Sequence, residues 1–215
     1  MLLAACQRLG AGAGRTAVDL GCGGGTDALA LLERGWSVLA IDIEQAGPAL
    51  LRARIPAACG QRIRLVCASV ADVALPPAHL VHAGFSLPFC PPPQFADVWE
   101  QIRRALAPGG IFAGQLFGTR DSWAGDPGMT FQDRSEVTRL LDGLEIIELH
   151  ETERDGEAYN GPRHWHTYDI LAREPAGHAH PRGNPQPSAK AHLAAEASGR
   201  STMLGAVPDR ASTTP

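Results

Sequence analysis

A glycine-rich loop, Gly21–Gly25, is the feature of the sequence that most restricts the possible folds. It follows the apolar segment Ala17–Leu20 and precedes Thr26–Arg34, whose apolar spacing predicts an amphipathic helix with Thr26 as its cap and Gly35 as its stop. A strand, a tight glycine turn and a helix let a ligand approach the backbone amides closely. The loop therefore predicts the first unit of an α/β fold, with a ligand site at the carboxyl end of the strand.

Two acids near this loop restrict the chemistry of the ligand. Asp19 lies two residues before the loop, where its carboxylate would repel a pyrophosphate. Thr26 stands where the dinucleotide-binding pattern requires Gly or Ala. S-adenosylmethionine (SAM) fits better, because it has a sulfonium, an α-ammonium and no phosphate, while its carboxylate can use the loop amides. Asp42, at the end of the next apolar segment, is placed to accept the ribose hydroxyls, although that role suits NAD equally.

The rest of the chain alternates short apolar runs with amphipathic stretches, which is typical of a mostly parallel sheet with crossover helices. We expect further strands at 37–41, 63–67, 80–83, 111–117, 144–153 and 164–172, and helices at 48–54, 95–106 and 134–141. The last two strands have no helix between them, so they should pair antiparallel across a turn at 154–161.

Three segments in chain order resemble motifs of the class I SAM-dependent methyltransferases. Asp19–Gly25 is similar to the family's first motif, Ile41–Asp42 to its ribose-binding acid, and Leu106–Gly110 to the turn before its fifth strand. The resemblance covers roughly residues 16–173 and extends to small bacterial members, including the tellurite-resistance type. It implies an α/β, Rossmann-like doubly wound sheet of seven strands in the order 3-2-1-4-5-7-6, the last antiparallel. It also implies methyl transfer from SAM to a small-molecule acceptor.

The expected cofactor site lies at the ends of the first four strands. Its residues are Asp19, Gly21, Cys22, Gly23, Asp42, Ile43, Ser69, Val70 and Ala83. The family often has an acid after the third strand, near the adenine amino group, whereas this chain has Ala68-Ser69-Val70, with Asp72 three residues after Ser69. Ser69 or the Val70 backbone is therefore expected to read the adenine. Only sixteen residues precede the first strand, so either the site is more open than usual or a true start lies upstream.

The acceptor pocket is expected in the loops after the fourth and fifth strands and on the last strand. Its candidate residues are Phe85, Phe89, Asp121, Trp123, His164 and His166. One histidine could serve as a general base or, with a carboxylate, as a metal ligand. The alternatives are packing for the phenylalanines, a salt-bridged loop anchor for Asp121 and Trp123, and a hydrogen-bonded pair for the histidines.

No catalytic residue and no metal are assigned from the sequence. Methyl transfer from a sulfonium chiefly needs in-line positioning and exclusion of water, so a dedicated base is required only for a weakly acidic acceptor. His82, inside the fourth strand, is expected to be buried and hydrogen-bonded. Cys22 has no basic partner in the sequence pattern and is expected to pack rather than react.

Composition argues against several classes of partner. Nineteen Lys and Arg against 23 Asp and Glu give a net charge of −4, and no Asn/Asp-Pro-Pro-Tyr/Phe motif follows the fourth strand, so a nucleic-acid substrate is not expected. No apolar run approaches the ~18 residues of a membrane span. Five scattered cysteines without a CxxC pair suggest neither disulfides nor a thiolate zinc site, and a reducing cytoplasm is the expected location.

Residues 1–173 are expected to form the domain, and 174–215 a disordered tail, because that segment is rich in Pro, Gly, Ala, Ser and Thr and lacks aromatics. Two rival functions remain open. A noncatalytic SAM-binding module would explain the short N-terminal segment and the altered adenine region. A nucleotide-dependent oxidoreductase would use the same ribose-binding acid, but Asp19 and Thr26 argue against it.

Overall fold

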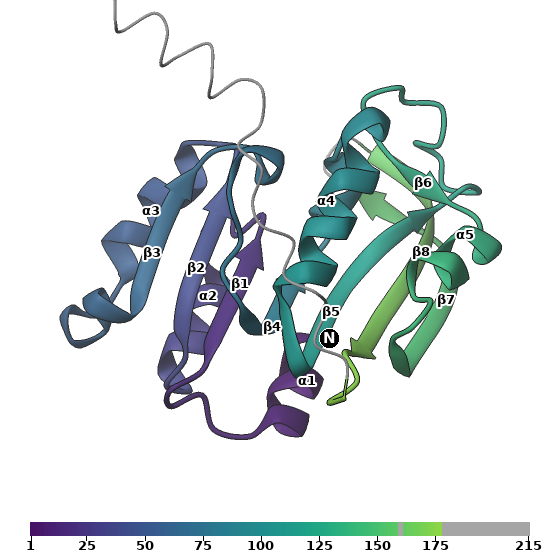
Figure 1. Ribbon diagram of the computed structural model, residues 1–215. Coiled ribbons are helices and arrows are strands. Elements are labelled where there is room, and N and C mark those ends of the chain that lie inside the picture. Colours follow the sequence, from purple (N-terminus) through teal and green to yellow (C-terminus); the bar gives the residue numbers. More distant parts are fainter. Residues whose placement is uncertain (159–160, 178–215) are drawn as a thin grey trace, which may run out of the picture. The chain divides into compact units, whose positions relative to one another are not determined.

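The computed structural model describes residues 1–158 and 161–177, and within them strands alternate with helices as the sequence predicts (Figure 1). The elements are α1 (Leu2–Leu9), β1 (Thr16–Leu20), α2 (Thr26–Glu33), β2 (Ser37–Asp42), α3 (Ala46–Arg54), η1 (Ala57–Arg62), β3 (Ile63–Cys67), η2 (Val70–Asp72), β4 (Ala78–Ala83), η3 (Leu87–Phe89), α4 (Pro92–Ala105), β5 (Leu106–Gly118), β6 (Phe131–Gln132), α5 (Arg134–Leu140), β7 (Glu145–Ala158) and β8 (Gly161–Arg173).

The strands form one mixed sheet in the order β3-β2-β1-β4-β5-β8-β7, with the two-residue β6 pairing alongside β5. β1 to β5 are parallel, and β8 runs antiparallel to both β5 and β7. Apart from β6, this is the seven-stranded Rossmann-like order expected from the sequence, with the last strand antiparallel. The carboxyl ends of β1 to β5 consequently lie at one edge, where the loops that follow them meet.

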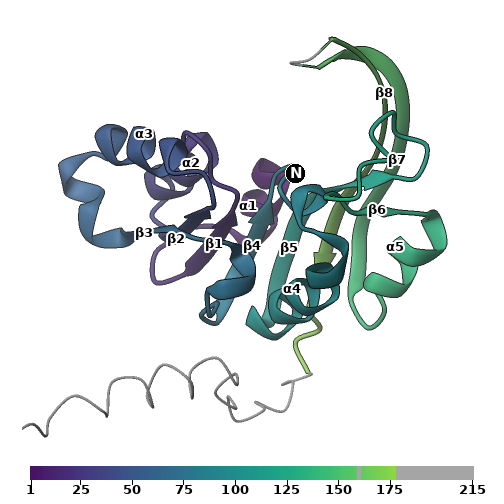
Figure 2. The ribbon, with the colours of Figure 1, turned by 90° about the horizontal axis from the view of Figure 1, so that it is seen from above.

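Helices cover both faces of the sheet (Figure 2). α1, α2 and α3 pack on one face, where Leu31, Trp36 and Leu51 are fully buried. α4 and α5 cover the other, where Trp99, Ile102 and Val137 contribute to the core. The predicted apolar stripe of α4 is confirmed, since Phe95, Val98, Trp99 and Ile102 are all buried. Burial of both faces explains why the central strands read as continuous apolar runs.

The structure corrects the prediction at several element ends. Gly25, with a positive φ of 81°, occupies the N-cap of α2, whereas Thr26 was expected there. The final hairpin is longer than predicted, because residues 154–158, expected in the turn, continue β7. Helix α1 and strand β6 were not predicted.

The expected boundary at residue 173 also moves. Glu174, assigned to the tail by composition, is only 2% exposed. Its amide donates to Gly110 O at 2.8 Å, and its carbonyl accepts from the Gly109 amide at 2.9 Å. The folded part therefore includes Glu174. Residues 178–215 of the expected tail, with His178 and His180, lie outside the described residues.

Among the residues described, no helix combines the length and the apolar character needed to cross a membrane.

Candidate cofactor and acceptor site

The glycine loop between β1 and α2 has positive φ angles at Gly21, Gly23 and Gly25, of 72°, 47° and 81°. Side chains rarely adopt this region, which explains the glycines. A Cβ on Gly21 would overlap Ser86, so the loop after β4 packs closely on the glycine loop. A Cβ on Gly23 would meet open space. The loop is therefore accessible to a ligand at Gly23.

The first three amides of this loop are already engaged within the protein. The amides of Gly21 and Cys22 both donate to Ile41 O, at 2.8 and 3.0 Å. The Gly23 amide donates to Asp42 Oδ2 at 2.7 Å. These three amides are therefore not free for a ligand carboxylate in this structure. Their bonds hold the loop against the end of β2.

Asp42 lies at the end of β2, as predicted, and has acceptor capacity to spare. Its Oδ1 accepts the Glu44 amide at 2.9 Å, and its Oδ2 accepts the Gly23 amide. A carboxylate offers about four lone-pair sites, so two bonds leave room for two more. The side chain is partly exposed at the edge of the sheet. It is therefore positioned to accept hydroxyl donors from a ligand.

Asp19, on β1 directly before the loop, is a buried acceptor without a complete set of donors. The residue is 2% exposed, and its Oδ2 has no hydrogen-bond partner. Burial raises the pKa of its carboxyl to about 7, although the nearby His82 imidazole works in the opposite direction. An unsatisfied buried oxygen is costly, so a ligand that brings a donor or a positive charge to it would be stabilised.

His82 lies opposite Asp19 on the neighbouring strand β4 and confirms the expectation of a buried, hydrogen-bonded histidine. Its Nδ1 is 3.0 Å from Ala113 O and its Nε2 is 3.1 Å from Asp27 Oδ2. Both nitrogens face acceptor oxygens, so both bonds form only when the pair holds an additional proton. Burial opposes the charged imidazole, but the bond to Asp27 and the charge of Asp19 raise the pKa of His82 overall.

The other predicted cofactor residues lie at the same edge of the sheet, where β2, β3 and β4 end. Ile43, beside Asp42, is 68% exposed, which leaves a free apolar surface. Ser69 caps η2 by accepting the Ala71 amide at 3.3 Å, and Val70 is partly buried. Ala83 is the buried last residue of β4. Cys22 is buried, and desolvation followed by the Asp19 charge raises the pKa of its thiol to about 12, so it is inert.

The predicted acceptor residues Phe85, Phe89 and Trp123 belong to one aromatic cluster. Phe117, at the end of β5, is its buried centre, 6.0 Å from Phe85, 6.2 Å from Phe89 and 6.3 Å from Trp123 between ring centroids. Trp165 of β8 completes the cluster, 6.1 Å from Phe117. Phe85 and Phe89 remain 45% and 54% exposed. The cluster therefore has a packed base and two rings that face solvent.

Asp121 anchors the loop after β5 through a buried ion pair. Its Oδ2 is 2.8 Å from Arg163 Nη2, and both side chains are almost fully buried. Its oxygens also accept from Arg163 Nε and from the amides of Trp123 and His166. Three hydrogen-bond donors and the ion-pair contact of Nη2 surround the buried carboxylate, which leaves little room for a ligand. The geometry thus favours the loop-anchor alternative for Asp121.

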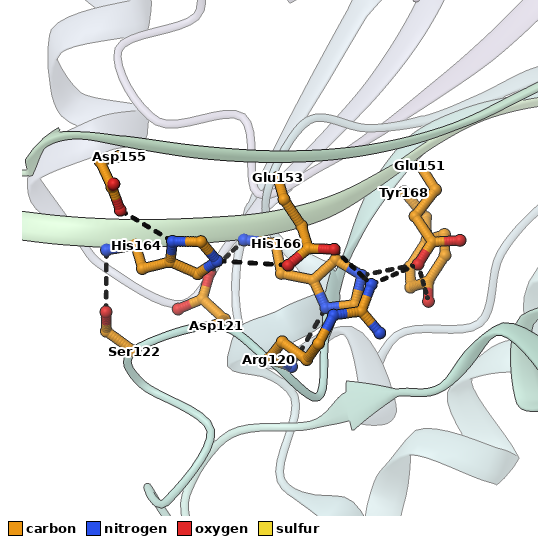
Figure 3. A network of polar contacts seen from close by, with 9 residues as sticks. All are labelled: Arg120, Asp121, Ser122, Glu151, Glu153, Asp155, His164, His166 and Tyr168. Atoms are coloured by element: carbon orange, nitrogen blue, oxygen red, sulfur yellow. Dashed lines mark hydrogen bonds and ion pairs between the residues drawn. The ribbon is translucent and has the colours of Figure 1, made fainter.

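His164 and His166 share one face of β8, as predicted, and both belong to a polar network with β7 and Arg120 (Figure 3). His164, partly exposed, contacts Asp155 at 2.8 Å and Glu153 at 3.4 Å. His166 is fully buried, and its Nδ1 accepts the Arg120 amide at 3.1 Å. That donor fixes the proton on Nε2, which donates to Glu151 Oε1 at 3.0 Å.

The same network contains the three side chains among the described residues that stand close enough to hold a metal ion together: Glu151, Glu153 and His166. Arg120 Nη2 already contacts the two carboxylates, at 2.8 and 2.5 Å. The Arg120 bond is the main reason that the pKa of Glu153 falls to about 2. His166 Nε2 carries a proton and offers no lone pair. The arrangement is therefore that of an ion-pair network, which fits the hydrogen-bonded alternative for both histidines.

Comparison with known proteins supports the resemblance found in the sequence. A family model described as a methyltransferase domain matches residues 17–110, the part that contains the glycine loop, Asp42 and β4. Over this part, the chain is similar to the SAM-dependent methyltransferases, as its motifs predict. One curated relative, carboxy-S-adenosyl-L-methionine synthase of Citrifermentans bemidjiense, is 33% identical over 108 residues, which cover 46% of this chain and 43% of that protein. The chain thus spans less than half the length of this relative.

Solved structures share the fold of this chain. TehB from Haemophilus influenzae is 16% identical with a TM-score of 0.66, over 80% of this chain and 61% of its own. The 1,6-didemethyltoxoflavin-N1-methyltransferase of Burkholderia thailandensis, solved with S-adenosylhomocysteine, is 20% identical with a TM-score of 0.60, over 81% of this chain and 76% of its own. At these identities the likeness shows that the chain shares their fold.

Sequence reasoning missed several residues that contact the predicted acceptor candidates. Arg163, Phe117 and Trp165 were not named as site residues, although Arg163 pairs with Asp121, and Phe117 and Trp165 both contact Phe85. The alternation along β8 contains the missing signal, since Arg163 and Trp165 share the face opposite to His164 and His166. Their meeting with the loop after β5 depends on the pairing of β8 with β5, which the local pattern does not specify.

Proposed function

We propose that this chain is a SAM-dependent methyltransferase that acts on a small-molecule acceptor. The observation that carries the proposal is the buried Asp19 carboxylate, whose Oδ2 has no partner and which lies beside an accessible glycine loop. A cationic ligand supplies what this oxygen lacks, and a phosphate would be repelled. The match of residues 17–110 to a methyltransferase-domain model supports the same cofactor.

Each residue has a distinct role in this proposal. Asp42 accepts the ribose hydroxyls with its unused lone pairs, and Asp19 offsets the positive charge of the amino-acid end of SAM. Ile43 and Val70 provide apolar contacts for the adenine at the ends of β2 and β3. Bound SAM supplies an electrophilic methyl group on a sulfonium. The protein's contribution is to fix the acceptor in line with that group and to exclude water.

The proposal requires no histidine base. His82 is bonded on both nitrogens beneath the loop, and His166 is bonded on both nitrogens within the network of Arg120. His164 contacts two carboxylates. We therefore expect an acceptor atom that is nucleophilic without assistance, and a methyl-transfer rate that depends mainly on how the acceptor is positioned.

Isothermal titration of the full chain with SAM, S-adenosylhomocysteine and NADH tests the cofactor. We expect micromolar binding of the first two and none of NADH. Binding of NADH alone would refute the proposal in favour of an oxidoreductase. Methyl transfer from isotopically labelled SAM to a panel of small acceptors then tests catalysis. SAM binding without transfer to any acceptor, or slow loss of label to water only, would instead support a noncatalytic SAM-binding module.

A further inference from the structure

Two exposed aromatic rings stand at the carboxyl edge of the sheet, on the loop between β4 and α4. Phe85 is the one non-glycine residue with a positive φ, 54°, among the described residues. That conformation is strained for a side chain of this size. The ring of Phe85 is 45% exposed. Strained residues of this kind concentrate at functional sites.

The rings beneath are arranged as a platform rather than a filled core. Phe85 lies 6.4 Å from Trp165 and Phe89 lies 6.4 Å from Trp123, each at an edge-to-face angle near 65°. Both also meet the buried Phe117. Edge-to-face and offset contacts are the favoured geometries between aromatic rings. A further flat ring placed on the exposed faces of Phe85 and Phe89 continues the same packing.

A guanidinium is sandwiched within this platform. Arg163 Cζ lies 3.5 Å from the ring centroid of Trp123 and 3.7 Å from that of Trp165, and the residue is 3% exposed. Asp121 balances its charge, so the pair is neutral and does not require an anionic ligand. However, Arg163 Nη1 and Nη2 are both buried without a hydrogen-bond partner, and only Nη2 lies within ion-pair distance of Asp121. A desolvated donor without an acceptor is costly, and a ligand oxygen relieves that cost.

We infer that Phe85, Phe89 and the Trp123–Arg163–Trp165 stack form an acceptor subsite for a planar aromatic molecule that carries an oxygen on its ring. The inference rests on the proposed function and specifies its substrate class. The aromatic faces select a flat ring, and Arg163 Nη1 selects the oxygen. The β4–α4 loop that carries Phe85 also packs on the glycine loop through Ser86, whose hydroxyl donates to Leu20 O at 2.6 Å. A ring on the platform therefore lies next to the proposed cofactor site.

Three probes of similar size test the subsite by isothermal titration of the full chain, with S-adenosylhomocysteine present and absent. They are 2-naphthol, naphthalene and decahydro-2-naphthol. We expect 2-naphthol to bind at least tenfold more tightly than decahydro-2-naphthol, and at least threefold more tightly than naphthalene. Equal binding of the flat and saturated alcohols would overturn the aromatic platform. Equal binding of 2-naphthol and naphthalene would overturn the role of Arg163.

Exposed residues provide variants that leave the fold intact. Phe85→Leu and Phe89→Leu should each weaken 2-naphthol binding fivefold or more, while S-adenosylhomocysteine binding stays within twofold. Ile146→Ala, an equally exposed apolar residue on β7, is the matched control and should change neither. Unchanged 2-naphthol affinity in both phenylalanine variants would refute the inference. If the unmodified protein does not bind S-adenosylhomocysteine, the proposed function is refuted. That outcome is distinct from failure of the subsite, because the aromatic probes are also titrated without S-adenosylhomocysteine.

Discussion

At the scale of one residue, the buried carboxylate of Asp19 destabilises the fold that contains it. Its folded pKa of about 7 lies above the ordinary 3.8 because of burial. The folded state therefore binds more protons than the unfolded state between these values, and the contribution of Asp19 to stability falls as pH rises from about 4 to about 7. Asp19→Asn changes the free energy of unfolding relative to the unmodified chain. We predict that this change is more favourable to the variant at pH 8 than at pH 5, by roughly 2–3 kcal/mol.

Urea unfolding at pH 5, 6.5 and 8 measures this difference. Asp97→Asn, a change at an exposed acid on α4, is the control and should give a pH profile parallel to that of the unmodified protein. The same Asp19→Asn variant should bind SAM at least tenfold more weakly, because the acceptor facing its cation is gone. Parallel pH profiles for Asp19→Asn and the unmodified protein would contradict the account of Asp19 as a desolvated carboxylate.

Asp42 is expected both to bind the ribose hydroxyls of SAM and to hold the glycine loop through the Gly23 amide. We predict that Asp42→Ala weakens SAM and S-adenosylhomocysteine binding by more than tenfold, about 1.4 kcal/mol or more, since the hydroxyls and the Gly23 amide both lose their acceptor. Asp42→Asn keeps one acceptor oxygen, so its SAM affinity should lie between that of the unmodified chain and that of Asp42→Ala. Glu44→Ala is the matched control, because only the Glu44 amide contacts Asp42. Near-normal affinity of Asp42→Ala, measured by titration calorimetry, would rule out the ribose assignment.

These two acids were predictable because position along a strand determines them. Asp19 and Asp42 close apolar runs that must be parallel strands, so their side chains had to reach the same edge of the sheet. The bonds of the Gly21, Cys22 and Gly23 amides were not predictable, because they depend on the positions of the Ile41 carbonyl and the Asp42 carboxylate in the folded protein. The same holds for Arg163, whose partners come from loops far away in the sequence.

At the scale of elements, the ion pair between Asp121 and Arg163 joins the loop after β5 to the β7–β8 hairpin. Removal of one partner leaves the other charge buried and unpaired. We predict that Asp121→Ala lowers the free energy of unfolding by about 3–5 kcal/mol. The double variant Asp121→Ala with Arg163→Met should be less destabilised than Asp121→Ala alone, because no unpaired charge remains. Chemical unfolding of the three proteins measures both effects.

Asp126→Ala, in the same loop, serves as the control for this prediction. Asp126 is exposed, and its carboxylate accepts only the Gly128 amide among the bonds within this loop. Its loss should cost about 1 kcal/mol or less. If Asp121→Ala lowers the free energy of unfolding no more than Asp126→Ala does, the anchor role of Asp121 is contradicted. It would also weaken the view that this ion pair holds Trp123 and Trp165 in the platform.

The elements themselves were predicted best where periodicity is long and strong. Strand β3 has its expected bounds, and the apolar face of α4 is buried as predicted. The hairpin tip was misjudged because charged residues such as Arg154, Asp155 and Glu157 resemble a turn, although here they continue an exposed strand. The two residues of β6 carry no pattern of their own and become a strand only because β5 offers a free edge there.

At the scale of the whole molecule, composition placed the end of the domain one residue or more too early. Glu174 bonds through its backbone to Gly109 and Gly110, and its side chain lies 3.9 Å from Arg103. We predict that a chain ending at residue 177 keeps the unfolding free energy of the full chain within about 0.5 kcal/mol and its SAM affinity within twofold. A chain ending at residue 173 should lose about 1–3 kcal/mol, because the amide of Gly109 and the carbonyl of Gly110 lose their partners.

Glu174→Gln in the chain ending at residue 177 separates the side chain from the backbone in this comparison. It removes the charge near Arg103 and keeps both backbone bonds, so it should cost less than the deletion of Glu174. Equal stability of the two truncated chains would show that the β8 end contributes nothing beyond Arg173. Glu174 lies at the start of β5, at the opposite end of the strand from Gly118 and the platform, so its contacts do not reach the proposed cofactor site. A lower SAM affinity of the chain ending at residue 177 would therefore contradict the prediction and assign residues 178–215 a part in SAM binding.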